Sequence, residues 1–213
     1  MDVERPGAQA WVPEEPDLDL MRAAVQGCRG CELWREATQA VFGEGAPAAR
    51  LILVGEQPGD REDLEGEPFV GPAGRVLAQA LVAAGIDRAD VYVTNAVKHF
   101  RFEERGKRRI HRRPDAGHIT ACRPWLEAEV AAVDPDVVVC LGATAARAVL
   151  GRFVKIGAER GTPIESGGRT TVVSIHPSAV LRLRDSGERS EAIAGLAADL
   201  RLAAQVARAA ESA

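Results

Sequence analysis

Short, uninterrupted runs of apolar and β-branched residues recur along the chain and predict buried strands. Three clear runs cover residues 51–54, 91–94 and 137–141, and a fourth covers residues 171–175. A parallel strand covered on both faces has this pattern, whereas a strand with one face in water alternates apolar and polar residues. We therefore predict a sheet that lies between two layers of helices.

Segments with the apolar spacing of helices alternate with these strands. Residues 75–84 form the first, residues 115–133 the second with an interruption at Pro124, residues 144–150 the third, and residues 188–210 a final helix. Alternation of strand and helix is typical of α/β proteins. The predicted fold is a three-layer α/β/α sandwich around a mostly parallel four-stranded sheet.

The length and composition favour one domain. The chain has 213 residues, of which 46% are hydrophobic, so one core is the simplest expectation, over residues 17–213. Residues 1–16 are rich in acids and prolines and are expected to form a poorly ordered arm, after which Asp17 can cap a short helix. No run approaches the roughly 20 apolar residues of a membrane span, and the N-terminus lacks a signal-peptide pattern. We expect a monomeric, cytoplasmic protein with no membrane partner.

Charge is unevenly distributed. A net charge of −4 gives no reason to expect a nucleic-acid partner. However, residues 98–113 are strongly basic, whereas residues 1–20 are acidic. Such a basic stretch can be a solvated surface that only holds phosphates.

The four cysteines are a candidate metal site. Cys28 and Cys31 form a C-x2-C pair, and Cys122 and Cys140 follow much later. Four thiolates suit a tetrahedral metal or a 4Fe-4S cluster. Zinc sites and redox dithiols share the C-x2-C spacing, and the later two cysteines can be small core residues. The residues alone leave these possibilities open.

Polar side chains follow the predicted strands. Glu56 comes after the first strand in a long loop rich in glycine, proline and carboxylates, Asn95 after the second, and His176 after the fourth. The carboxyl ends of parallel strands meet at one edge of a sheet, where ligands bind. A carboxylate, an amide and an imidazole together can bind and polarise a heterocycle, although singly an Asn can cap and a His-Pro pair can form a turn.

These stretches resemble the family 4 branch of the uracil-DNA glycosylase superfamily. The similarity lies in the Gly-Glu-x-Pro-Gly loop, the Pro-Phe-Val-Gly-x-Ala-Gly run, the Thr-Asn-x-Val-Lys segment and the His-Pro-Ser-x-x-Leu-Arg motif, and spans residues 28–182. The resemblance implies an enzyme that excises uracil from DNA, with single-stranded and double-stranded DNA as candidate substrates. It also implies a 4Fe-4S cluster held by Cys28, Cys31, Cys122 and Cys140.

The resemblance also implies roles for individual residues. Phe69 is expected to stack on a flipped-out uracil, and Asn95 to hydrogen-bond its pairing edge. His176 donates toward the uracil oxygen that gains charge. Glu56 stabilises the oxocarbenium-like sugar or acts as a base, with Asp63 as a candidate helper. The remaining expected contacts are with uracil for Gln57 and Asp60, and with DNA or the neighbouring loop for Lys107, Arg109, Ser178 and Arg182.

Two departures from the ordinary family 4 pattern resemble the X-type subgroup (UdgX). Gln57 stands where alanine is usual, and residues 107–111 form an inserted Lys-Arg-Arg-Ile-His loop. In that subgroup the histidine at the position of His111 attacks the anomeric carbon after uracil leaves, so the enzyme turns over once. A neutral imidazole held beside this carbon competes with water at high effective concentration. Gln57 is expected to occupy or order the space of a hydrolytic water.

Two other functions use the same motifs. A conventional glycosylase has the same pocket but releases the abasic product after attack by water. A non-enzymatic module recognises uracil or abasic sites without breaking a bond. Between the covalently trapped enzyme and the conventional glycosylase, only Gln57 and His111 distinguish single from multiple turnover. His99 and His118 belong to no motif and are expected at the surface.

Overall fold

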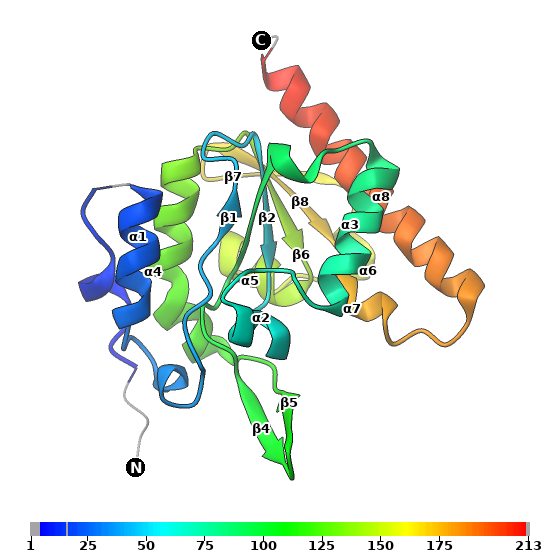
Figure 1. Ribbon diagram of the computed structural model, residues 1–213. Coiled ribbons are helices and arrows are strands. Elements are labelled where there is room, and N and C mark those ends of the chain that lie inside the picture. The colour runs from blue at the N-terminus through cyan, green and yellow to red at the C-terminus, as the bar shows by residue number, and fades with distance from the viewer. Residues whose placement is uncertain (1–4, 16, 212–213) are drawn as a thin grey trace.

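The computed structural model describes residues 5–15 and 17–211 and contains a six-stranded sheet between two layers of helices (Figure 1). The strand order is β1-β3-β2-β6-β8-β7. The predicted α/β sandwich with a mostly parallel sheet is confirmed. The strands are β1 (Glu44–Gly45), β2 (Leu51–Gly55), β3 (Val91–Asn95), β6 (Val137–Leu141), β7 (Pro163–Ser166) and β8 (Arg169–Ser174).

The sheet is wider than predicted. The four predicted strands form its parallel centre, in the order β3, β2, β6, β8. Two short strands, β1 and β7, add antiparallel edges to β3 and β8. Neither edge strand contains a run of buried apolar residues, so the hydrophobic pattern could not indicate them.

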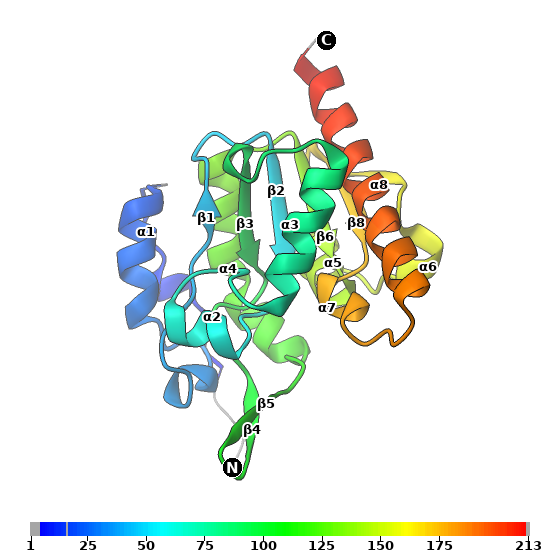
Figure 2. The same ribbon diagram turned by 45° about the vertical axis from the view of Figure 1, so that its right-hand side comes forward.

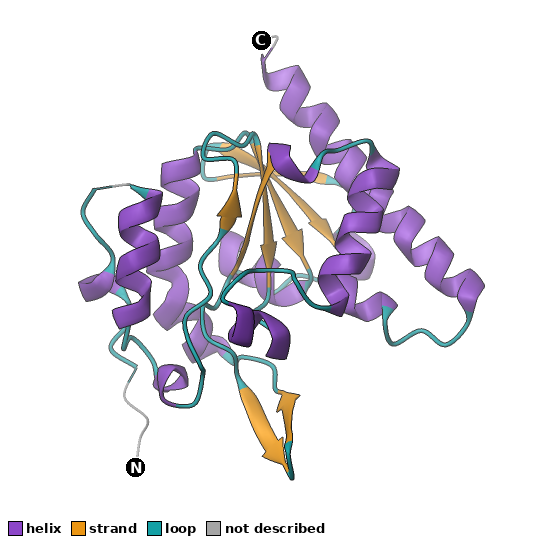
Figure 3. Cartoon of the chain, viewed as in Figure 1, coloured by secondary structure: helices purple, strands orange, loops and turns teal. Residues whose placement is uncertain are grey.

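Helices cover both faces of the sheet (Figure 3). Side chains of successive strand residues point to opposite faces, and all five residues of β2, β3 and β6 are buried. Ile52 and Val54 belong to a core with residues of α1, α4 and α5, whereas Leu51 and Leu53 pack with residues of α3 and α8. The helices are α1 (Leu18–Ala24), α2 (Asp60–Glu65), α3 (Pro72–Ala84), α4 (Ala116–Val133), α5 (Ala143–Leu150), α6 (Ile156–Glu159), α7 (Pro177–Val180) and α8 (Ser186–Glu211).

Shorter elements complete the chain. Single 3-10 turns cover Gln9–Trp11, Val25–Gly27, Glu32–Arg35 and Arg88–Asp90. Within the described part of the chain, no helix is both long and apolar enough to cross a membrane.

Helix α4 continues through Pro124, contrary to the predicted interruption. A proline inside a helix removes one backbone hydrogen bond and strains the preceding turn. Buried residues on both sides of it, Ile119 and Cys122 before and Trp125 and Leu126 after, pack into the core. This packing holds the two halves of the helix in one element.

The described part of the expected N-terminal arm packs on the domain. Ala8 is buried, and its backbone N–H donates to the carbonyl of Ala121. The Arg5 guanidinium pairs with Glu32 and Asp115, which belong to different segments of the domain. A poorly ordered arm would not make such contacts. Residues 5–15 are instead held by apolar and charged contacts with α4 and with segments next to it. Residues 1–4 and 16 lie outside the described residues.

A hairpin extends from the edge of the sheet where the parallel strands end. Strands β4 (Phe102–Arg105) and β5 (Arg108–His111) pair antiparallel, and the inserted basic loop is therefore their turn and second strand. Figure 2 shows the hairpin at the same end of the molecule as α2 and α7. The carboxyl ends of β2, β3, β6 and β8 thus face a space bordered by these three elements.

Candidate active site

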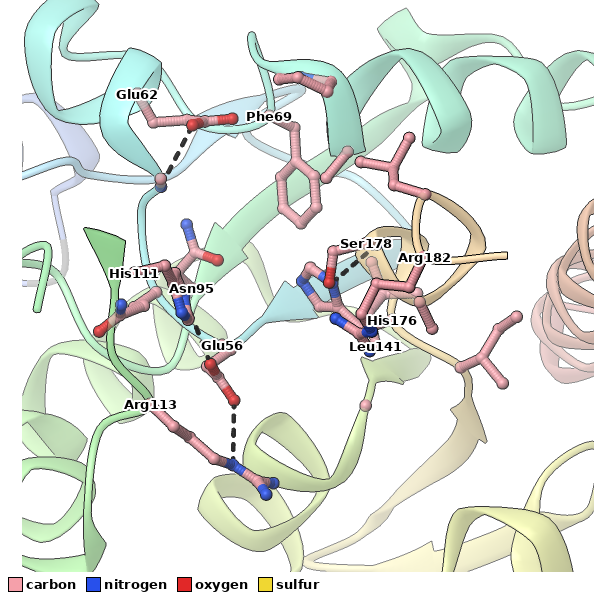
Figure 4. A pocket seen from close by; sticks show the side chains of 18 of the residues that line it. Glu56, Glu62, Phe69, Asn95, His111, Arg113, Leu141, His176, Ser178 and Arg182 are labelled. Atoms are coloured by element: carbon pink, nitrogen blue, oxygen red, sulfur yellow. Dashed lines mark hydrogen bonds and ion pairs between the residues drawn. The ribbon is translucent and has the colours of Figure 1, made fainter. Parts of the chain in front are cut away.

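A cavity of about 1000 Å³ lies at the carboxyl ends of the parallel strands. Its lining brings together side chains that are far apart in the sequence and come from each strand-end segment (Figure 4). The residues predicted from the sequence that line it are Glu56, Gln57, Asp60, Phe69, Asn95, His111, His176, Ser178 and Arg182. Lys107 and Arg109 belong to the hairpin outside this lining.

Phe69 and Asn95 meet over Gly55. A Cβ on Gly55 would lie 2.4 Å from Asn95 Oδ1 and 2.7 Å from Phe69 Cζ, so only glycine allows both side chains to approach the end of β2. Phe69 itself has φ of 60°, a left-handed backbone conformation that is uncommon for a bulky residue. The close carbonyl of Phe69 leaves no room for a Cβ at Gly74. The loop is therefore built to present one aromatic ring.

Lys98, which the sequence offered only as part of a motif, fixes the end of β3 that carries Asn95. Its side chain is fully buried and donates to Thr94 Oγ1 at 2.7 Å and to the Asn95 carbonyl at 2.9 Å. It also forms an ion pair with the buried Glu129. A buried cation needs such partners, so Lys98 is a structural support rather than a phosphate contact.

His176 precedes α7 and has one defined tautomer. The backbone N–H of Ser178 donates to His176 Nδ1 at 3.1 Å, and Ser178 Oγ lies 2.8 Å from the same nitrogen. Burial, together with smaller contributions from His111 and Arg182, lowers the pKa of His176 to about 4. The ring is therefore neutral at pH 7, and because Nδ1 accepts, Nε2 carries the proton. The ring lies nearly parallel to Phe69, with centroids 6.3 Å apart.

Glu56 connects the hairpin to the sheet. Its Oε1 lies 3.5 Å from His111 Nε2, and its Oε2 lies 3.3 Å from Arg113 Nε (Figure 4). The Thr144 hydroxyl also donates to Oε2. Arg113 and Thr144 were missed from the sequence. Thr144 follows β6 at the strand-end edge, so the rule that selected Glu56, Asn95 and His176 could have found it.

His111 ends β5 and faces the cavity from its mouth. Its side chain is 47% exposed, and its ring lies beside that of Phe100, with centroids 6.0 Å apart. Burial lowers the pKa of His111, the Glu56 carboxylate raises it and Arg182 lowers it, and the net pKa is below the usual histidine value. A neutral imidazole, with a lone pair on one nitrogen, therefore predominates at neutral pH.

Gln57 differs from its expected contact with uracil. Its Nε2 donates to the carbonyls of Arg101 and Arg112, each at 3.1 Å, and its Oε1 accepts from the Arg101 N–H at 3.2 Å. The buried amide thus connects the end of β2 to the two backbone segments at the base of the hairpin, one before β4 and one after β5. Only an amide can donate twice and accept once in this position.

Arg109 holds the hairpin against α2. Its guanidinium contacts Asp60 Oδ1 and Asp63 Oδ2, each at 2.6 Å, and lies over the rings of Phe100 and Phe102. The Asp60 carboxylate, expected to contact uracil, is thus paired with Arg109. Asp63, a candidate helper of Glu56, is fully buried and also receives the Thr38 N–H. Both carboxylates therefore position the hairpin.

Two of the remaining charged residues are exposed, and a third holds the loops around Phe69. Lys107 lies exposed at the hairpin turn, and Arg182 is exposed at the cavity edge. Glu62, which the sequence did not single out, accepts from the N–H groups of Gly59 and Gly71. It therefore holds together the two glycine loops that frame Phe69.

All four cysteines are buried in one core. Burial and the thiols of Cys31 and Cys28 raise the pKa of Cys122, the Lys98 charge opposes them, and the resulting pKa is about 12. For Cys140, within β6 between Val54 and Val173, burial raises the thiol pKa. Over residues 5–15 and 17–211, no three or more His, Cys, Asp or Glu side chains are arranged to hold a metal ion.

His99 and His118 are buried, not at the surface as expected. His118 lies 2.9 Å from Glu32 and 3.0 Å from Asp115, so it joins the network of Arg5. His99 is 5% exposed, and burial lowers its pKa to about 4. No sequence motif marks either residue.

Comparisons with known proteins agree with this fold. Residues 42–201 match the uracil DNA glycosylase superfamily. A type-4 uracil-DNA glycosylase of Thermotoga maritima is 38% identical over 171 residues, which cover 79% of this chain and 85% of the relative. One from Archaeoglobus fulgidus is 36% identical, over 77% of this chain and 83% of that protein. A type-5 uracil-DNA glycosylase of Pyrobaculum aerophilum is 32% identical, over 76% of each chain.

The α/β sandwich with its strand-end cavity is thus that of a base-excising glycosylase fold. The chain belongs to the uracil-DNA glycosylase superfamily, with relatives of type 4 at 34–40% identity.

Proposed function

We propose that this protein excises uracil from DNA and then forms a covalent bond between His111 and the abasic deoxyribose. The observation that carries the second step is the neutral His111 ring beside the Glu56 carboxylate at the mouth of the cavity. Relatives named as uracil-DNA glycosylases and the strand-end cavity support the first step. Uracil-containing DNA is the expected partner.

Excision requires a uracil turned out of the stack into the cavity. Phe69 offers a flat ring, and Asn95 an amide for the pairing edge. When the C1′–N1 bond breaks, its electron pair passes to uracil. The Nε2–H of neutral His176 can donate to the charged uracil oxygen, as a fixed donor does for an oxyanion. Glu56 faces the sugar side, where a carboxylate stabilises an oxocarbenium-like carbon.

Capture then uses His111 in place of water. The ring nitrogen with the free lone pair forms a bond to C1′, which gives an imidazolium. The proton on the other nitrogen passes to the Glu56 carboxylate, so the product is a neutral N-alkyl imidazole and a protonated Glu56. Gln57 and Arg109 support this geometry, because their contacts fix both ends of the strand that carries His111.

The proposal includes a 4Fe-4S cluster with a structural role. Cys28, Cys31 and Cys122 are buried thiols with the soft donor chemistry of such a cluster, and the thiols of Cys28 and Cys31 act on the pKa of Cys122, although the described side chains are not arranged around a metal ion. Cys140, the fourth ligand expected from the sequence, pairs inside the sheet. His99 is the better candidate, because it is buried and follows Lys98, whose backbone N–H lies 3.2 Å from Cys122 Sγ.

Iron content and visible absorption distinguish the two candidates for the fourth ligand. We expect Cys140→Ala to keep the brown colour and the iron of the wild type, and His99→Ala to lose them. The reverse result would make Cys140 the ligand. A colourless wild type, purified without oxygen, would remove the cluster from the proposal.

A denaturing gel tests the covalent step. The protein is mixed with a single-stranded oligonucleotide that contains one uracil, beside His111→Ser and beside the same oligonucleotide with thymine. We expect a heat- and detergent-resistant complex only for the wild type with uracil, and alkali-labile abasic DNA for His111→Ser. A double-stranded substrate in the same assay establishes strand preference.

The conventional glycosylase is the second candidate, because the named relatives of type 4 support excision as well as they support capture. Water then attacks C1′ and the product is released. Abasic DNA without a resistant complex from the wild type would establish it. If the wild type forms neither abasic DNA nor a resistant complex, the protein is the non-enzymatic binding module.

A further inference from the structure

The two oxygens of Glu56 have different partners. Oε2 accepts a hydrogen bond from the Thr144 hydroxyl and lies 3.3 Å from Arg113 Nε. Oε1 lies on the other side, 3.5 Å from His111 Nε2 (Figure 4). One oxygen is therefore held by the protein, and the other is directed toward the reacting groups.

The direction of the Thr144 hydrogen bond follows from its other contact. Arg113 Nε donates to Thr144 Oγ1 at 3.1 Å, and a guanidinium has no acceptor. The single hydroxyl proton of Thr144 is therefore available for Glu56. Arg113, Thr144 and Glu56 form a closed ring of contacts: Arg113 Nε donates to Thr144, Thr144 donates to Glu56, and Glu56 forms an ion pair with Arg113.

Thr144 is also in a rigid place. It is 3% exposed and lies in the first turn of α5, directly after β6. Gly142, the N-cap of this helix, has φ of 95°, and its N–H donates to the Ser174 carbonyl at the end of β8. Two central strands thus fix the position of the Thr144 hydroxyl.

We infer that Thr144, assisted by Arg113, is a positioning residue that holds Glu56 with Oε1 toward the anomeric carbon and His111. This inference rests on the proposed function. A glutamate side chain has several staggered conformations, and without an anchor it samples them. Arg113 is 64% exposed, so water weakens its contribution.

The first variant is Thr144→Val, which keeps the shape of the side chain and removes the hydroxyl. Loss of one hydrogen bond to a charged group is expected to slow uracil release about 10- to 100-fold. Thr144→Ser restores the donor and is expected to stay within about threefold of the wild type. Thermal unfolding of the two variants shows whether both keep the fold.

The split between rate and substrate affinity separates positioning from a general loss of structure. Single-turnover uracil release is measured over a range of protein concentrations in a His111→Ser background, where capture cannot contribute. With Thr144→Val the maximal rate is expected to fall, whereas the protein concentration that gives half the maximal rate is expected to stay within about twofold, because Glu56 acts on the sugar in the transition state.

Arg113 provides a second test if Thr144→Val does not fold. Arg113→Gln is expected to lower the maximal rate by a smaller factor. Arg112→Gln is the matched control, because this neighbour is similarly exposed but pairs with Glu103. It removes the same charge from the hairpin and is expected to leave the maximal rate within about twofold of the parent protein.

Each outcome decides the inference. A maximal rate that stays within about twofold of the parent protein with both Thr144→Val and Arg113→Gln, while the wild type releases uracil, overturns the positioning role alone. Thr144→Ser as slow as Thr144→Val also overturns it, since the hydroxyl is then not the active feature. No uracil release from the wild type overturns the proposed function, and the inference with it.

Discussion

The inner end of the cavity, formed by Phe69, Asn95 and His176, and the β4–β5 hairpin are held in place by different forces. The inner residues lie at the ends of buried strands or in loops with tight backbone packing. The hairpin has exposed strands, and its described contacts with the domain are largely polar, from Gln57 and Arg109. The packed core holds the inner end of the cavity in position, whereas a few long-range hydrogen bonds and ion pairs hold the hairpin in position.

This difference matters for the proposed reaction. The inner end alone is sufficient for excision, since it binds and polarises the base. Capture additionally needs His111 at a fixed distance from the sugar, and effective concentration falls steeply when a reacting group is misplaced. Substitutions in the hairpin are therefore expected to separate capture from excision, whereas those at the inner end are expected to reduce both.

The largest effect is expected from His176→Ala. Removal of a fixed donor to a developing oxyanion slows such reactions about 100- to 1000-fold, so uracil release and the covalent complex should fall together. Ser178→Ala is the matched control: it removes the hydroxyl contact but keeps the backbone N–H that sets the tautomer, and should cost much less. Single-turnover release of uracil measures both. A His176→Ala variant within tenfold of the wild type would contradict this role.

A smaller and selective effect is expected from Arg109→Lys. Lysine keeps a charge near the buried Asp63 but cannot contact Asp60 and Asp63 together in the same fork geometry. We expect the ratio of covalent complex to free abasic product to fall about tenfold, with uracil release within about twofold. The ratio is read from one gel after alkali treatment.

Lys107→Ala is the control for Arg109→Lys, because Lys107 lies exposed at the turn of the same hairpin. If it contacts phosphate, its loss weakens DNA binding and lowers both products equally, so their ratio stays constant. An equal loss of both products in Arg109→Lys would show that the hairpin serves binding and not capture.

The sequence predicted the region built by the core better than the region built by polar contacts. The runs at residues 51–54, 91–94 and 137–141 indicated the central strands, because burial on both faces leaves a strong pattern. The strand-end rule then brought Glu56, Asn95 and His176 to one edge. The edge strands and the hairpin left no such pattern, because their residues are largely charged and exposed.

Individual polar partners could not be predicted for a related reason. The amide of Gln57 contacts residues 44 and 55 positions away, and such pairs depend on how the loops meet in space. Cys140 has the right chemistry for a metal ligand, but it lies in β6 beside Val54 and Val173, and no local pattern shows whether a strand residue can reach the other cysteines. His99 is buried by tertiary packing that no local motif records.

The smallest effect concerns the acid sensitivity of capture. Only the neutral form of His111 has a lone pair for C1′, and a histidine with an ordinary pKa near 6.5 would be about 90% protonated at pH 5.5. Because burial and Arg182 lower the pKa of His111, the neutral form persists to lower pH. We expect the capture rate to fall less between pH 7.5 and pH 5.5 than the roughly tenfold fall of an ordinary histidine. Arg182→Gln removes one cause of the lowered pKa and should make capture fall at higher pH than in the wild type. A tenfold fall in the capture rate of the wild type between pH 7.5 and pH 5.5 would mean that the hairpin leaves His111 as exposed to water as a free histidine. His111 and the buried His176 would then differ in environment more than the structure indicates.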